Sequence, residues 1–159
     1  MGAEMSLPTI SIGEAEAILL SLVHAPGSRE ESAFDPDHIR RAAIKQGATD
    51  HAWPISGIED RSDSELLAEL ALPADIERES VIIIPNDSFR PSRDLFCKAF
   101  LLRGQQLGEF IRSYHARTGS YFFDGDTVFL FPNSRQIIML HHEGFGIKLN
   151  MSTHRRSSM

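Results

Sequence analysis

The stretch 127–140 decides the fold of this chain. It reads TVFLF at residues 127–131 and QIIML at residues 136–140, with Pro132-Asn133-Ser134 between them. Both runs are rich in β-branched and aromatic residues, whereas proline, asparagine and serine are typical of turns. Because the runs are apolar on both faces, we expect two strands that are covered on both sides.

The residues on either side of this pair extend the same pattern. Tyr121-Phe122-Phe123 is followed by Asp124-Gly125, a strong signal for a two-residue hairpin. After the pair comes a second turn signal, Glu143-Gly144, and then an alternation of apolar residues at Phe145, Ile147 and Leu149. The sequence therefore predicts a β-meander over residues 120–150.

The middle of the chain predicts one more strand and a long helix. Residues 81–84 read VIII and are bounded by Ser80 and Pro85, as expected of a buried strand. Residues 91–117 carry apolar side chains on one helical stripe and end before Gly119, so we expect the main helix there. Gly104 and Gly108 weaken this helix and mark either a close approach to another element or a kink.

The first 75 residues look helical and rich in loops. Capping-box spacing at Ser11–Glu14 and at Ser62–Glu65 predicts two helix starts, and Asp35-Pro36 predicts a third. These helices should stop at Pro26-Gly27, Pro73 and Gly47, respectively, and residues 49–60 read as irregular.

Together these elements predict an α+β fold with a mainly antiparallel sheet. The C-terminal meander belongs to the sheet, the helix 91–117 covers one face, and the N-terminal helices cover the other. At 159 residues, 1–159 is expected to be a single domain. It comprises a helical, loop-rich part (1–75), a strand–helix–meander core (80–150) and a flexible tail (151–159).

Composition and charge narrow the functional class. Residues 1–80 carry 16 acidic and 6 basic side chains (−10), and residues 81–159 carry 6 acidic and 10 basic ones (+4), which sum to the net charge of −6. An acidic half disfavours nucleic acid and fits a basic partner. No apolar run approaches the roughly 18 residues that cross a bilayer, so no membrane partner is expected. The lone Cys97 and the lack of a signal-like N-terminus favour a cytoplasmic location.

The most conspicuous polar group is His141-His142-Glu143. Two histidines can bind a metal, and a glutamate can act as a base. At the end of a strand, however, neighbouring side chains point to opposite faces, so both histidines are not expected to reach one ion. Asp124 and Asp126 are a second weak metal candidate. We therefore expect no metal, no cofactor and no catalytic residue, since a nucleophile elbow and glycine-rich phosphate loops are also missing from the sequence.

The acidic N-terminal half supplies the candidate contacts for a partner. Trp53 is either a core anchor or an aromatic contact residue. The candidate partner-binding residues are Trp53, Glu30, Glu31, Asp35, Asp37, Glu59, Asp60 and Asp63.

Three classes of function remain, and the sequence leans against an enzyme. The first is a small acidic protein-binding module, with a bacterial immunity protein that neutralises a cognate toxin as the leading hypothesis. Complementing a basic toxin cleft requires charge and shape rather than a motif. The second is a hydrolase or nucleotide-processing enzyme that uses His141, His142 and Glu143. The third is a secretion chaperone or a regulatory subunit.

Overall fold

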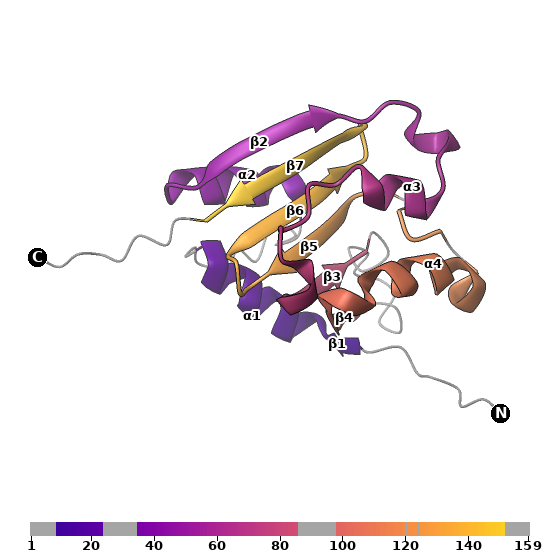
Figure 1. Ribbon diagram of the computed structural model, residues 1–159. Helices are drawn as coiled ribbons and strands as arrows, with labels where there is room; N and C mark the ends of the chain where they lie inside the picture. Colours follow the sequence, from indigo (N-terminus) through magenta and orange to yellow (C-terminus); the bar gives the residue numbers. More distant parts are fainter. Residues whose placement is uncertain (1–8, 24–34, 86–97, 120, 124, 152–159) are drawn as a thin grey trace, which may run out of the picture.

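The computed structural model describes residues 9–23, 35–85, 98–119, 121–123 and 125–151. In this part of the chain, seven antiparallel strands form one sheet in the order β1-β4-β3-β5-β6-β7-β2 (Figure 1). Helices cover both of its faces, which confirms the predicted α+β class. The strands are Thr9–Ser11 (β1), Thr49–Pro54 (β2), Ser80–Ile84 (β3), Lys98–Arg103 (β4), Thr127–Phe131 (β5), Gln136–His141 (β6) and Phe145–Asn150 (β7).

The meander is confirmed for β5, β6 and β7, which pair in sequence order. The expected first strand at residues 121–123 is wrong, because this segment has no strand partner. Its backbone donors are satisfied by a side chain instead: the carboxylate of Asp63 accepts hydrogen bonds from the N–H groups of Phe122 (2.8 Å) and Phe123 (3.1 Å). Asp124, the first residue of the expected hairpin turn, lies outside the described residues.

The long helix predicted over 91–117 is only half correct. Lys98–Arg103 is strand β4, which pairs with β3 on one side and β1 on the other. The short 3₁₀ helix Gly104–Gln106 (η5) follows, and α4 then spans Leu107–Thr118. Gly104 does mark a close approach, since a Cβ atom there would lie 1.7 Å from the carbonyl oxygen of Ile76. The expected residues 91–97 lie outside the described part.

On one face, α1 (Ile12–Val23) and α2 (Pro36–Lys45) pack on the sheet through aliphatic side chains. The predicted capping box opens α1, because Ser11 Oγ accepts from Glu14 N–H and the Glu14 carboxylate accepts from Ser11 N–H. Small residues allow close packing here, and Ala15 and Ala43 are fully buried. The predicted stop of the first helix at Pro26-Gly27 lies outside the described residues.

The opposite face is covered by α4 and by α3 (Asp63–Ala68). Placing all N-terminal helices opposite the main helix was therefore wrong for α3, although its predicted capping box, Ser62 with Glu65, is present. Two short 3₁₀ helices lie in the connections, at Ile58–Asp60 (η1) and Ile76–Arg78 (η2). This core is rich in aromatic rings. Its buried aromatic residues are Phe100, Phe110, Tyr114, Phe122, Phe123, Phe129 and Phe131.

Residues 49–54, predicted to be irregular, form the edge strand β2, which pairs with β7. Trp53 on β2 is partly buried, packs against the aromatic core and donates from its Nε1 to the carbonyl of Glu69 at 3.0 Å. Its indole lies over Gly146, where a Cβ would come within 2.5 Å of the ring. Within the described residues, no helix has the length and apolar character needed to cross a membrane.

Candidate functional site

The histidine pair lies where β6 turns into β7. His141 is the last residue of β6, and His142 belongs to the turn that Gly144 completes with a positive φ of 97°. In the β5–β6 register Thr127 lies opposite Leu140, so the residue before Thr127 is brought next to this turn. That residue is Asp126, and its Oδ1 lies 2.8 Å from both the backbone nitrogen and Nδ1 of His142.

The side chain of His141 is buried and occupied by hydrogen bonds. Its Nδ1 accepts from the backbone N–H of Glu143 at 3.1 Å. The ring proton therefore sits on Nε2, which faces the carboxylate of Asp37 at 3.4 Å. The ring is stacked between Phe145, at a centroid distance of 4.4 Å, and His142, at 4.5 Å.

The expectation that His141 and His142 point to opposite faces is wrong. Strand alternation applies only while the chain stays extended, and His142 already belongs to the turn. Its backbone N–H and ring both bind Asp126, which turns the ring back over His141. The two rings therefore lie on top of one another.

Carboxylates surround His142 and control its charge. The hydrogen bond to Asp126 raises the pKa of His142 above its ordinary value of 6.5, and slight burial opposes this rise. The negative charges of Asp126, Glu143 and Asp37 raise the pKa further. His142 thus gains a proton more readily than a free histidine, while its side chain remains 57% exposed.

Asp126, His141 and His142 are close enough to be considered as metal ligands, because one ligand atom from each lies within 4.8 Å of the others. Their orientation does not fit a chelate. Stacked rings confine their in-plane lone pairs to two nearly parallel planes, which disfavours their meeting at one ion. A metal on Nε2 of His141 would also put the ring proton on Nδ1, facing the N–H of Glu143. The absence of a bound metal stays a prediction, now on different grounds, and Asp124 lies outside the described residues.

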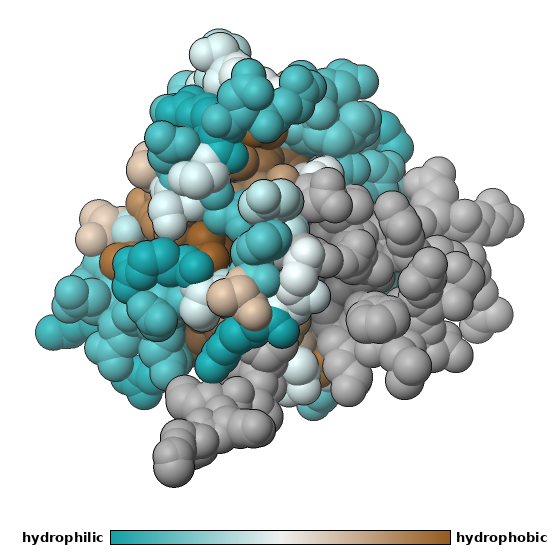
Figure 2. Space-filling model, turned by 90° about the vertical axis from the view of Figure 1, so that its right-hand side faces the viewer, coloured by the Kyte–Doolittle hydropathy of each residue, from teal (hydrophilic) through white to brown (hydrophobic). Residues whose placement is uncertain are grey.

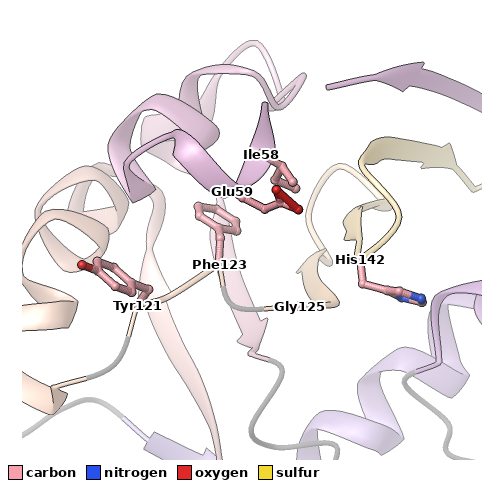
Figure 3. A pocket seen from close by; sticks show the side chains of 6 residues that line it. All are labelled: Ile58, Glu59, Tyr121, Phe123, Gly125 and His142. Carbon is pink, nitrogen blue, oxygen red and sulfur yellow. The ribbon is translucent and has the colours of Figure 1, made fainter. Parts of the chain in front are cut away.

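An open pocket of about 340 Å³ adjoins the His142 turn. Figure 3 shows Glu59 and Phe123 close together on one side of Gly125, with His142 on the other side and Tyr121 set apart. Tyr121 is 64% exposed and stacks on His115 of α4 at a centroid distance of 4.3 Å. Ile58 of η1 completes the pocket wall.

Figure 2 views the molecule from the side on which α3 and α4 lie in Figure 1. Hydrophilic residues predominate among the described residues on this face, and apolar ones show in the gaps between them. A ligand that approaches from this side therefore meets mostly polar side chains.

The structure separates the predicted partner-binding residues into three groups. Glu59 and Asp60 are exposed on η1, and Asp37 is exposed at the start of α2 beside His141. Asp63 and Trp53 are instead engaged within the protein, the former by the backbone of residues 122–123 and the latter by Glu69 and the aromatic core. Asp35 is the half-buried N-cap of α2. Glu30 and Glu31 lie outside the described residues.

Sequence reasoning missed the contact between Asp126 and His142. It therefore also missed that charged residues from several elements lie close together around this turn. We refer to His142 with Asp37, Glu59, Asp126 and Glu143 as the His142 site. The strand register contained the necessary signal, because pairing 127–131 with 136–140 around the turn places residue 126 beside residue 141. Placing Asp37 and Glu59 there required the packing of α2 and η1, which no local pattern encodes.

Comparison with models of protein families, with curated proteins and with solved structures finds no match to this chain. Its function is therefore argued from the His142 site.

Proposed function

We propose that this chain is a cytoplasmic protein-binding module that neutralises a basic partner, in the manner of a bacterial immunity protein and its cognate toxin. One observation carries the proposal: carboxylates from three separate segments lie around His142, and the carboxylate of a fourth segment lines the adjoining pocket. Asp37, Asp126 and Glu143 are close enough to raise the pKa of His142, and Glu59 lines the pocket that His142 borders.

The position of these carboxylates suits contact with another protein. The side chains of Asp37 and Glu143 are 55% and 69% exposed, so both remain accessible to a partner. Their backbones are held by a helix start and by a tight turn between two strands, which keeps the charges in place without a partner. Preorganised charge of one sign speeds the encounter with an oppositely charged surface and selects against acidic partners.

The pair of Asp126 and His142 favours a second candidate function. A carboxylate that accepts from Nδ1–H leaves Nε2 of the same ring as a proton acceptor, which is the arrangement of a general base. A hydrolase or nucleotide-processing enzyme would use His142 in this role. We rank it second because the pocket offers few groups that could assist His142. Among the described residues that line it, the other polar side chains are those of Glu59 and Tyr121.

The partner to test is any basic toxin or secreted effector that a gene neighbouring the gene for this chain encodes. The purified chain should bind it and abolish its toxic activity at one equivalent. The double variant Glu59→Lys with Asp60→Lys should slow association at least tenfold at low salt, because both side chains are exposed on η1 and Glu59 lines the pocket. Raising the salt concentration should reduce this difference.

A matched control is Asp75→Lys with Glu77→Lys, which changes the charge equally at the exposed N-cap of η2 and at an exposed residue within it. It should slow association much less than the η1 variant does. Equal slowing by both variants would mean that net charge, and not the His142 site, drives binding. Hydrolysis of a nucleotide or ester by the free chain, lost in His142→Gln, would instead establish the enzyme.

A further inference from the structure

Among the strands of the described residues, β2 is an edge of the sheet, and its register determines which of its backbone groups face outward. Ile55 N–H donates to the carbonyl of Gly144, so the ladder with β7 continues through Trp53, His51 and Thr49. The backbone groups of Asp50, Ala52 and Pro54 therefore point away from the sheet. Pro54 fits this arrangement, because an outward position loses no ladder bond when it lacks an N–H group.

The outward hydrogen-bonding capacity of β2 is limited to two residues. The next outward position before Asp50 is Ala48, whose N–H is already bound to the carbonyl of Ala43. The next outward position after Ala52 is Pro54, which has no N–H group. Within the described residues, Asp50 and Ala52 each keep an outward N–H and C=O, and they are two residues apart. An antiparallel copy of the same strand satisfies all four donors when Asp50 lies opposite Ala52 of the copy and Ala52 lies opposite its Asp50.

Charge does not protect this edge. Natural edge strands often carry unpaired charged side chains that discourage pairing with another strand. The carboxylate of Asp50 is already paired with the guanidinium of Arg40 at 2.6 Å, and the remaining residues of β2 carry no acid, lysine or arginine. A second copy therefore meets no like charge that is left uncompensated.

An exposed apolar side chain lies beside the same edge. Ile44 of α2 is 47% exposed, and it follows Arg40 by four residues, so both lie on one flank of the helix. The Arg40–Asp50 ion pair shows that this flank faces β2. Ile44 is also next to the β2 start, because Ala48 binds the neighbouring Ala43. In the register above, residue 48 lies opposite Pro54 of the copy, which brings Ile44 toward that proline.

From these observations we propose that the chain forms a symmetric dimer through antiparallel pairing of β2 with β2 of a second copy. The twofold axis passes beside His51, and the two sheets become continuous. Four backbone hydrogen bonds and one isoleucine from each copy make a small interface, so we expect a weak dimer that forms at concentrations on the order of 100 µM.

Sedimentation velocity over a concentration series tests the proposal with the full chain. The mass should rise from 17.8 kDa toward about 36 kDa, twice the chain mass. Ala52→Pro removes an outward donor without touching the β7 ladder and should weaken association at least tenfold, as should Ile44→Lys. The control Leu101→Lys changes a similarly exposed residue on β4, across the sheet from β2, and should leave association unchanged.

Amide hydrogen exchange supplies a second measurement that does not depend on a variant. Exchange at Asp50 and Ala52 should slow as the protein concentration rises, whereas exchange at other exposed amides should not change. A chain that stays monomeric at about 1 mM would overturn the proposal. So would a dimer that both Ala52→Pro and Ile44→Lys leave intact, because its interface would lie elsewhere.

Discussion

On the face that α1 and α2 cover, the sheet presents aliphatic side chains, whereas on the face that α3 and α4 cover it presents Phe129 and Phe131 among other rings. The central strands β5 and β6 are buried on both faces, but by different means. The aliphatic side uses small residues such as Ala15 and Ala43 to bring two full helices close to the strands. On the aromatic side, large rings fill the space beside the six-residue helix α3.

This difference predicts unequal losses when adjacent residues of β5 are truncated. Phe129 and Val128 are both fully buried, and they point to the aromatic and the aliphatic core, respectively. Phe129→Ala should lower the free energy of unfolding by about 3–5 kcal/mol, and Val128→Ala by about 2 kcal/mol. Urea denaturation measures both values. Equal losses would show that the rings do not carry the larger share of the packing.

The contact between Trp53 and Gly146 allows the packing at the edge of the aromatic side to be tested. Gly146→Ala places a methyl group about where the indole ring lies, so Trp53 must move and its hydrogen bond to Glu69 is strained. We expect a loss of about 1–3 kcal/mol in unfolding free energy. Gly108→Ala is the control, since nothing lies within 4 Å of a Cβ there, and it should leave stability unchanged or raise it by up to about 1 kcal/mol.

Asp63 and Asp60, which the sequence assigned to one partner-binding surface, should contribute differently to the free energy of unfolding. Asp63→Ala leaves two backbone donors of the aromatic side, those of Phe122 and Phe123, without their acceptor, at a cost of about 1–3 kcal/mol. Asp60→Ala changes an exposed side chain and should stay within about 0.5 kcal/mol. Thermal or chemical unfolding measures both losses. An Asp63→Ala variant as stable as the parent would show that the Asp63 carboxylate is available to contact a partner.

Sequence reasoning succeeded where local patterns determine the structure and failed where contacts between distant parts of the chain determine it. The meander was predictable because β5, β6 and β7 pair with their sequence neighbours across short turns. The same apolar patterns predict six core residues, and all six are buried, with exposures of 0–7%; they are Val128, Leu130, Ile138, Leu140, Phe100 and Phe110.

Strand β4 was not predictable in this way. Ala99 and Phe100 fit a helical stripe with Leu107, Phe110 and Tyr114 as well as they fit a strand. The choice was made by pairing with β3, which residues 85–97 separate from β4, and with β1, which lies far from β4 in sequence. At the His142 site, the sequence identified the histidines and several of the acids but not their contacts. A one-residue shift at the end of β6 placed His142 in the turn, and that reversed its direction.

The smallest effect we predict concerns the charge on His142. The hydrogen bond from its ring to Asp126 is the main cause of its raised pKa, so Asp126→Asn should lower that pKa toward 6.5. Titration of the ring proton by NMR measures the shift directly. The control Asp75→Asn removes an exposed charge at the N-cap of η2 and should leave the titration of His142 unchanged.

The same shift has a definite sign in stability. Because the folded protein binds this proton more tightly than the unfolded chain, the stabilisation is fully present below the unfolded pKa of about 6.5 and is lost as the pH rises through the higher folded value. The free-energy difference between the parent and Asp126→Asn should therefore shrink on going from pH 5 to pH 8. It should be small throughout, since more than half of the His142 side chain is exposed. A difference that stays constant between pH 5 and pH 8 would mean that Asp126 stabilises the turn through the backbone N–H of His142 rather than through its ring.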